Sequence, residues 1–275
     1  MDSNTIYEQK LRMLYEFIMH YYYYLRDKGT APIVYIDGGE CTGTTTISKK
    51  VCAALNESDK FIWTREPSQH CKDTIITPLS HERFLENPGK KIEYITEVFT
   101  SDRAINQQTL SNNEIKISDR GMFSTFIYQS GILNPAADAG DVMRNCQVIL
   151  DKAIKFDIRL PITSINLVSL LENDKEDEEV FNYRLNRRIQ KGEKLDGMDK
   201  FDVLMRVNKA YSDISRMLIK AMSPLSFRTF DFKDDMDEKV NNIILHIHHV
   251  IDSINTIKNS KNTFNMNYKP LSIYN

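Results

Sequence analysis

The sequence predicts an α/β protein in which a five-stranded parallel sheet lies between two layers of helices. Five short apolar runs alternate with longer stretches of helical spacing, and no internal repeat interrupts this order. The runs cover residues 33–37, 61–64, 115–118, 164–171 and 226–232. A chain of 275 residues can bury one core of this kind, with right-handed crossovers between its strands.

The helical stretches divide the chain into three parts. An N-terminal helical extension covers residues 1–30, a central α/β domain covers 31–235, and a C-terminal helix with a loose tail covers 236–275. We expect helices at residues 5–27, 45–55, 90–110, 123–129, 139–155, 201–222 and 236–257. The acidic run at 172–179 is typical of a solvated helix start rather than a metal site.

Composition excludes several classes of protein. The 36 basic and 38 acidic residues leave a net charge of −2, which argues against sequence-independent nucleic-acid binding. No apolar run reaches the ~18–20 residues that span a membrane, and no signal peptide is evident. The four cysteines have neither C-x-x-C nor zinc spacing, so we expect free thiols in reducing cytoplasm (Cys41, Cys52, Cys71 and Cys146).

The segment 32–49, PIVYIDGGECTGTTTISK, organises the chain. A buried strand, a glycine-bearing turn and a helix start follow one another, and this order makes a cradle for phosphate. Gly38 and Gly43 have P-loop spacing, and Thr45 stands where the magnesium-binding hydroxyl belongs. The lysine position of that motif is occupied by Thr44.

Charged residues follow the second and third strands. Arg65 and Glu66 precede Pro67, and Asp119 and Arg120 end the third strand. Ligands of open parallel sheets sit outside the carboxyl ends of the strands, and paired acidic and basic groups suit magnesium–phosphate chemistry. The competing interpretation of Glu66 is a loop carboxylate in solvent.

Two further stretches favour a nucleotide. Phe99 and Arg103 are four apart on one helical face, where an aromatic ring could stack on a base and a guanidinium could bond its edge. The alternative is a core phenylalanine beside a surface arginine. A basic stretch before Gly192 suits a lid over polyphosphate, although a charged solvent face would have the same composition (Arg184, Arg187, Arg188 and Lys191).

Five segments in order, within about residues 33–232, resemble the thymidylate kinases of the wider group of P-loop nucleoside and nucleotide kinases. The segments are DGGECTGTTT, TREP, VFTSDRA, ISDRGMFSTFIYQSG and RLNRRIQKGEKLD. The stretch VYIDG…TTT also resembles herpesvirus-type thymidine kinases. The resemblance implies a P-loop NTPase three-layer sandwich with a basic lid, and it makes residues 31–235 a nucleotide kinase domain.

This resemblance also implies an activity, namely transfer of the ATP γ-phosphate to dTMP, or to a related deoxypyrimidine monophosphate such as a modified dUMP, with Mg²⁺. Arg65 would bind the acceptor phosphate, and Thr45 with Asp119 would organise magnesium. Phe99 would stack on thymine and Arg103 would hydrogen-bond the base.

Other roles follow from the same matches. Tyr128 would lie against the deoxyribose, Gln129 would line the base or sugar pocket, and Glu66 would be a second acidic group there. The resemblance assigns catalysis to Glu40, Asp119, Arg120, Arg187 and Arg188, with Arg120 also clamping phosphate. It assigns ATP binding to Gly38, Gly39, Glu40, Cys41, Thr42, Gly43, Thr44, Thr45, Thr46 and Arg184.

The resemblance also implies a homodimer, in which the helices at 90–110 and 139–155 could pack across the interface. The divergent composition favours a viral lineage, with the protein in the host cytoplasm.

Thr44 leaves three hypotheses open. A lid cation, or Lys49 or Lys50, replaces the charge of the missing lysine, and the chain is an active monophosphate kinase. Alternatively the chain phosphorylates thymidine itself, with Glu66 as the general base. The third hypothesis is a nucleotide-binding homologue that is catalytically weak or inactive.

Overall fold

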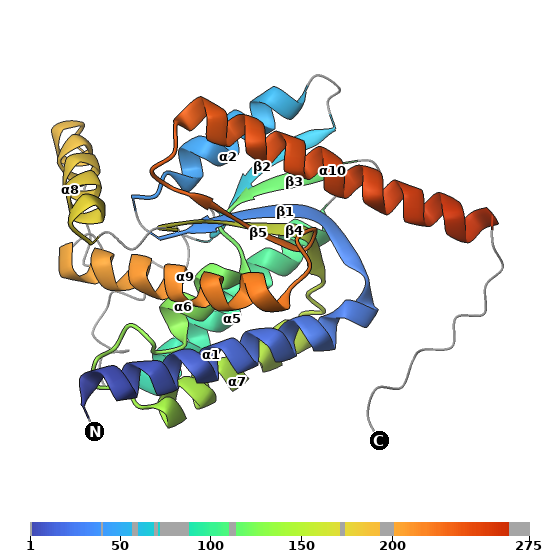
Figure 1. Cartoon of the computed structure of the whole chain (residues 1–275). Coiled ribbons are helices and arrows are strands. Elements are labelled where there is room, and N and C mark those ends of the chain that lie inside the picture. The colour runs from blue at the N-terminus through green and yellow to red at the C-terminus, as the bar shows by residue number, and fades with distance from the viewer. Residues whose placement is uncertain are drawn as a thin grey trace.

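The computed structural model describes residues 2–39, 41–56, 60–68, 71, 88–109, 114–170, 174–192 and 201–263. Its described strands form one five-stranded parallel sheet in the order β2-β3-β1-β4-β5, which confirms the predicted fold class (Figure 1). The strands are β1 (Thr30–Gly38), β2 (Phe61–Arg65), β3 (Ile115–Asp119), β4 (Leu160–Val168) and β5 (Phe227–Asp231). The connection from β1 leads to β2 on one side of β1, and the connection from β3 leads to β4 on the other side. A ligand crevice is therefore expected at the carboxyl ends of β1 and β3.

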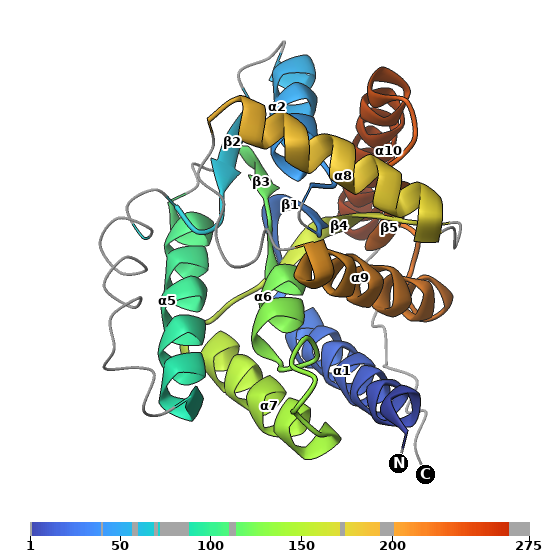
Figure 2. The same ribbon diagram turned by 90° about the vertical axis from the view of Figure 1, so that its left-hand side faces the viewer.

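Helices cover both faces of the sheet, as Figures 1 and 2 show. One face carries α2 (Thr44–Leu55) and α10 (Met236–Thr263). The other carries α1 (Ser3–Leu25), α5 (Pro88–Gln108), α6 (Met122–Gln129), α7 (Ala139–Lys155) and α9 (Phe201–Ala221). Helix α8 (Asp174–Gln190) stands beside the edge at which the strands end (Figure 2).

Each layer has its own apolar core. Residues 33–38 of β1 are all buried, as expected for a parallel strand with helices on both sides. The core under α2 and α10 includes Ile36, Ile47, Val51, Leu167 and Ile243. The core on the opposite face includes Leu14, Tyr21, Phe126, Ile149 and Ile214.

Helix α1 packs against α7 and α9 and contributes to the second of these cores. Asp2 caps its N-terminus by accepting from the Thr5 backbone N–H over 2.8 Å. An apolar stripe of helical spacing is fully buried (Leu14, Ile18, Tyr21 and Leu25). The helix predicted at residues 5–27 is therefore present and packs on the core, while the division of the chain at residues 30 and 235 stays a prediction.

The fourth strand begins earlier than predicted. We expected it at residues 164–171, but β4 runs from Leu160 to Val168. Pro161 pairs with Ala31 just before a register shift in the β1–β4 ladder, and proline is tolerated at such a strand start. The proline makes this segment resemble a turn in the sequence, which is why its first residues were missed.

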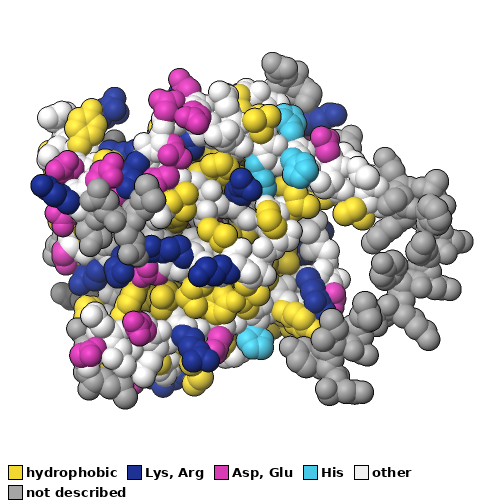
Figure 3. Space-filling view, in the orientation of Figure 1, with side chains coloured by type: hydrophobic (Ala, Val, Ile, Leu, Met, Phe, Trp, Pro, Cys, Tyr) yellow, Lys and Arg dark blue, Asp and Glu magenta, His cyan; other side chains and the backbone are white. Residues whose placement is uncertain are grey.

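Among the described residues, no helix has the length and apolarity to cross a bilayer. On the face in Figure 3, acidic and basic side chains are interspersed rather than gathered by sign.

Candidate active site

The loop after β1 has the conformation of a phosphate cradle. Gly43 precedes α2 with a φ of 93°, a conformation that glycine adopts without strain. A β-carbon on Gly39 would come within 2.0 Å of the Asn208 side-chain oxygen, so any other residue there would displace the Asn208 side chain of α9. Thr42 closes the turn by donating from Oγ1 to the Gly39 carbonyl over 2.8 Å. Glu40 lies outside the described residues.

The N-terminus of α2 opens toward this loop. No side-chain hydrogen bond from the described residues caps it, and its first turn contains no acidic residue. The first backbone N–H groups of a helix lack partners within the helix and carry its positive dipole end. At this helix end the predicted phosphate site therefore offers backbone N–H donors, and Thr44 adds no charge to them.

Thr45 and Asp119 come together as predicted. The Thr45 hydroxyl donates to Oδ2 of Asp119 over 2.5 Å. Oδ1 of this buried carboxylate has no hydrogen-bond partner among the described residues. A hydroxyl beside a carboxylate with an unsatisfied oxygen suits Mg²⁺, which prefers oxygen ligands.

The two lysines considered as substitutes for the P-loop lysine lie elsewhere. Lys49 Nζ sits 4.7 Å from the centre of the Trp63 ring, and Lys50 pairs with Asp237 at 2.7 Å. Neither side chain lines the cavity at the loop.

Arginines of α8 reach the loop instead. Arg184 donates to the Cys41 carbonyl over 2.7 Å and to the Phe232 carbonyl over 3.1 Å. Arg188 NH1 lies 3.9 Å from the Cys41 sulfur. Lys239, which we did not predict, donates to the same Phe232 carbonyl over 2.8 Å, and burial lowers the pKa of its ammonium to about 8.

Arg120 joins the loop to α6. Its backbone φ is 82°, and its NH1 donates to the Gly38 carbonyl. Its guanidinium carbon lies 5.8 Å from the centre of the Tyr128 ring. Arg65 lies at the end of β2, half exposed, with its Nε 3.8 Å from Asp119 Oδ2. Two arginines thus flank the predicted magnesium ligands.

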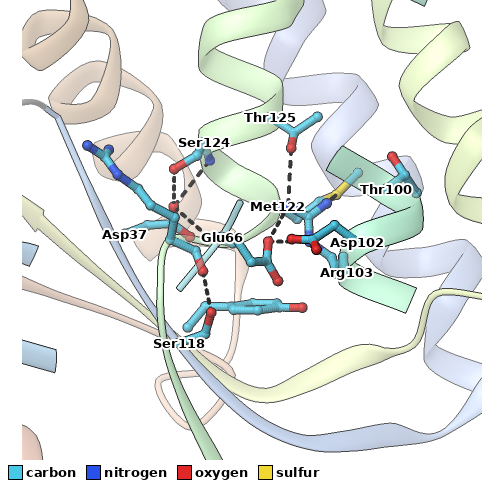
Figure 4. A network of polar contacts seen from close by, with 12 residues as sticks. Asp37, Glu66, Thr100, Asp102, Arg103, Ser118, Met122, Ser124 and Thr125 are labelled. Atoms are coloured by element: carbon cyan, nitrogen blue, oxygen red, sulfur yellow. Dashed lines mark hydrogen bonds and ion pairs between the residues drawn. The ribbon is translucent and has the colours of Figure 1, made fainter. Parts of the chain in front are cut away.

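Glu66 and Arg103 form a buried ion pair, shown in Figure 4. Arg103 Nε donates to Glu66 Oε2 over 2.8 Å, and its NH2 lies 2.6 Å from the same oxygen. Burial raises the pKa of Glu66 to about 7, and the charge of Arg103 only partly offsets this effect. The solvent-exposed alternative for Glu66 is wrong, because only 4% of the residue is exposed.

The remaining donors of Arg103 point at α6 rather than at open space. NH1 contacts the Met122 sulfur at 2.7 Å, and NH2 contacts Thr125 Oγ1 at 3.2 Å. Arg103 therefore lines the cavity with its guanidinium already bonded, and it is not the surface arginine of our alternative interpretation.

Many of these groups line one cavity of about 960 Å³ at the carboxyl ends of β1, β2 and β3, whereas the predicted residues Gly38, Thr42 and Asp119 are not among its lining residues. Phe99, Tyr128 and Gln129 form its wall between α5 and α6, and the lid arginines close the opposite side. Its lining includes most predicted residues (Gly39, Cys41, Gly43, Thr44, Thr45, Thr46, Arg65, Glu66, Phe99, Arg103, Arg120, Tyr128, Gln129, Arg184, Arg187, Arg188 and Lys191). A second cavity of about 270 Å³, between α8 and α9, contains none of them.

Asp37 is a structural residue that we did not assign. Its Oδ1 accepts from the Gly121 and Ser124 backbone N–H groups and, over 2.5 Å, from the Ser124 hydroxyl (Figure 4). This buried carboxylate fixes the N-terminus of α6, the helix that carries Tyr128 and Gln129. Its place directly before the glycines was the available signal.

Comparison with known proteins agrees with this geometry at the level of the fold. No protein-family model matches the chain, and no curated protein matches it by sequence. Among solved structures, it resembles a deoxyadenosine kinase from M. mycoides, described with the products dCMP and a flexible dCDP bound. The match has a TM-score of 0.53 and 16% identity and covers 79% of this chain and 99% of that one. The chain therefore shares the α/β fold of that kinase structure.

Proposed function

We propose that this protein is a magnesium-dependent kinase that transfers the γ-phosphate of ATP to dTMP or a related deoxypyrimidine monophosphate. The observation that carries the proposal is that one cavity contains two complementary halves. On one side lie the arginines of α8 and a helix N-terminus that no side chain of the described residues caps, and on the other lies an aromatic and amide wall. A donor and an acceptor nucleotide could each occupy one half of this cavity, with their phosphates next to each other.

The acceptor phosphate would be held between these halves. Arg65 is half exposed at the cavity, and Arg120 bridges the loop and α6. Guanidinium groups bind phosphate through paired, charge-assisted hydrogen bonds. A nucleoside without a phosphate would leave Arg65 with little to bind, so this residue favours a monophosphate.

The donor side would combine backbone, metal and guanidinium groups. Thr45 and Asp119 would hold Mg²⁺, which when bound supplies positive charge to the donor phosphates. The N–H groups of the loop and of α2 would align the phosphates, and Arg184 and Arg188 would add charge from α8. Phosphoryl transfer needs alignment and electrostatic stabilisation above all, so this set does not require the missing lysine.

Glu66 supports a second candidate, a deoxynucleoside kinase acting on thymidine. It is buried in the cavity wall, its Oε1 has no partner among the described residues, and its pKa lies near neutrality. Such a carboxylate could accept the proton of a 5′-hydroxyl as that oxygen attacks the γ-phosphate. A third candidate, a nucleotide-binding protein without turnover, is motivated by Thr44.

A coupled assay with ATP and Mg²⁺ distinguishes these candidates, run on dTMP, dUMP and thymidine. For a monophosphate kinase, Arg65→Met should lower kcat/KM for dTMP about 10–100-fold, because a charged hydrogen bond contributes about 1.5–3 kcal/mol. Turnover of thymidine that survives Arg65→Met and is abolished by Glu66→Gln would establish the nucleoside kinase instead. Binding of dTMP without any turnover would leave the third candidate.

We also propose that the protein acts as a homodimer in a reducing cytoplasm, without membrane or nucleic-acid partners. Apolar side chains are exposed on both helices suggested for the dimer, Ile105 on α5 and Met143 on α7. Sedimentation of the wild type beside an Ile105→Glu, Met143→Glu variant tests this. A wild type that sediments as a monomer would refute the dimer.

A further inference from the structure

Helix α9 contains a buried asparagine whose side chain packs on the loop after β1. Asn208 is 7% exposed, and its Nδ2 donates to the Leu204 carbonyl over 2.9 Å. A backbone carbonyl can only accept a hydrogen bond, so this contact fixes which way the amide points. The amide oxygen Oδ1 therefore faces Gly39, and it lies 2.0 Å from the position that a β-carbon on Gly39 would occupy.

Gly39 is held from two sides. Thr42 donates from Oγ1 to the Gly39 carbonyl over 2.8 Å, and the Asn208 amide covers the side of Gly39 on which other residues carry a side chain. Gly39 also lines the large cavity, whereas Asn208 does not. Asn208 would therefore act on a ligand in that cavity through the position of the loop.

Resting on the proposed function, the geometry points to Asn208 as the positioning residue that holds the loop after β1 in the conformation that binds the donor triphosphate. A loop that binds phosphates through its backbone N–H groups needs those groups already oriented, because ordering them on binding costs affinity. The bond between Thr45 and Asp119 fixes the end of the loop at α2. Asn208 fixes its beginning, directly after β1.

A double-mutant cycle with Gly39 tests this contact specifically. Gly39 is not among the residues with a positive φ, and the three atoms nearest to a β-carbon built on it all belong to Asn208. Gly39→Ala should therefore displace the amide from the loop. In Asn208→Ala, by contrast, the added methyl group would enter the space that the amide has left.

The measurement is calorimetric titration of ATP with Mg²⁺, and separately of dTMP, so that no turnover is needed. The proteins are the wild type, Asn208→Ala, Gly39→Ala and the double variant. Ser212→Ala is the matched control, because Ser212 is 4% exposed one turn along α9 and lines the same small cavity as Asn208. Its hydroxyl accepts from the Ser169 backbone N–H over 3.2 Å.

Thermal melts establish that each variant is folded. If Asn208→Ala does not fold, Asn208→Ser takes its place in the cycle, because serine keeps a polar group at this buried position but is too short to cover Gly39.

We expect Asn208→Ala to weaken ATP binding about three- to tenfold, the loss of about one neutral hydrogen bond. Its dTMP affinity should change less than about twofold, and Ser212→Ala should bind both ligands as the wild type does. Gly39→Ala should weaken ATP binding at least as strongly as Asn208→Ala. Added to Asn208→Ala, it should cost less than about twofold, because substitutions that remove the same contact are not additive.

Two results would overturn the inference while leaving the proposed function standing. One is an Asn208→Ala protein whose ATP affinity matches that of Ser212→Ala, or whose dTMP affinity falls as much as its ATP affinity. The other is a Gly39→Ala loss of the same size in both backgrounds, which would mean that the glycine serves the phosphates without Asn208. A wild type that does not bind ATP would overturn the proposed function itself, and the inference with it.

Discussion

Arg184 of α8 donates to the backbone carbonyl of Cys41 over 2.7 Å, so the predicted lid helix is bonded directly to the loop after β1. The two residues are 143 positions apart in the sequence. A second bond to the Phe232 carbonyl holds the guanidinium from the side of β5. This relationship places a positive charge beside the loop whose motif lysine is replaced by Thr44.

Arg184→Met should therefore lower kcat about 10²–10³-fold, the loss expected when a donor aimed at developing transition-state charge is removed. Acceptor binding should change little, because the hydrogen bonds of Arg184 within the described part of the chain go to the loop and to the end of β5. The measurement is kcat and the acceptor Kd from the same preparation. Lys50→Met is the matched control, since Lys50 pairs with Asp237 outside the cavity, and an equal effect of both substitutions would contradict the role of Arg184.

Thr44→Lys tests the same charge from the opposite direction. If Arg184 supplies the charge, Thr44→Lys should change the kcat of the wild type less than tenfold. The same substitution made in Arg184→Met should raise the kcat of that variant at least tenfold. These bounds follow from the non-additivity of groups that share one role. Single-turnover rates of the four proteins complete the cycle. Activity only in proteins carrying Thr44→Lys would mean a disabled donor site and would favour the binding hypothesis.

Local patterns explain why so much could be predicted from the sequence. Every described strand except β4 ends at a glycine or a charged residue, and that pattern depends only on neighbours in the chain. Because parallel strands end at one edge, strand-end residues such as Arg65 and Asp119 had to lie near each other. The cavity indeed lies at this edge and includes Arg65.

Pairings across the fold could not be predicted in this way. Glu66 and Arg103 each had a plausible role on its own, but their mutual bond joins a strand end to a helix and depends on how α5 packs. Thr96 reads in the sequence as an ordinary helical threonine, and only the packing of α5 on α6 brings it to Gln129. Such contacts are set by tertiary structure, which residue spacing does not encode.

Helix α1 provides a stability prediction with a control two residues away. Tyr21 is 1% exposed and packs edge-on against Phe126, whereas Tyr23 is 58% exposed. Tyr21→Ala should lower the free energy of unfolding by about 3–5 kcal/mol, as large-to-small core substitutions of aromatic residues do. Tyr23→Ala should cost less than about 1 kcal/mol. Urea titrations of both variants measure this, and equal small losses would show that α1 is dispensable for the stability of the core.

The Glu66–Arg103 pair gives a pH dependence with a definite sign. The pKa of Glu66 is raised from its usual 4.5 to about 7 in the folded protein, chiefly because the carboxyl is buried. Such a group contributes stability below pH ~4.5 and loses that contribution as the pH rises through about 7, because ionisation is harder in the folded state. The loss for a shift of this size is of the order of 3 kcal/mol.

Stability of the wild type should therefore fall between pH 5 and 8 more steeply than that of Glu66→Gln, which has no carboxyl to ionise. Asp37, whose pKa is also raised by burial, contributes a slope of the same sign to both proteins and cancels in the comparison. Melting temperatures at half-unit intervals measure the two slopes. Parallel curves would mean that Arg103 keeps Glu66 ionised throughout this range, and the carboxylate could then serve as a base only at the expense of that ion pair.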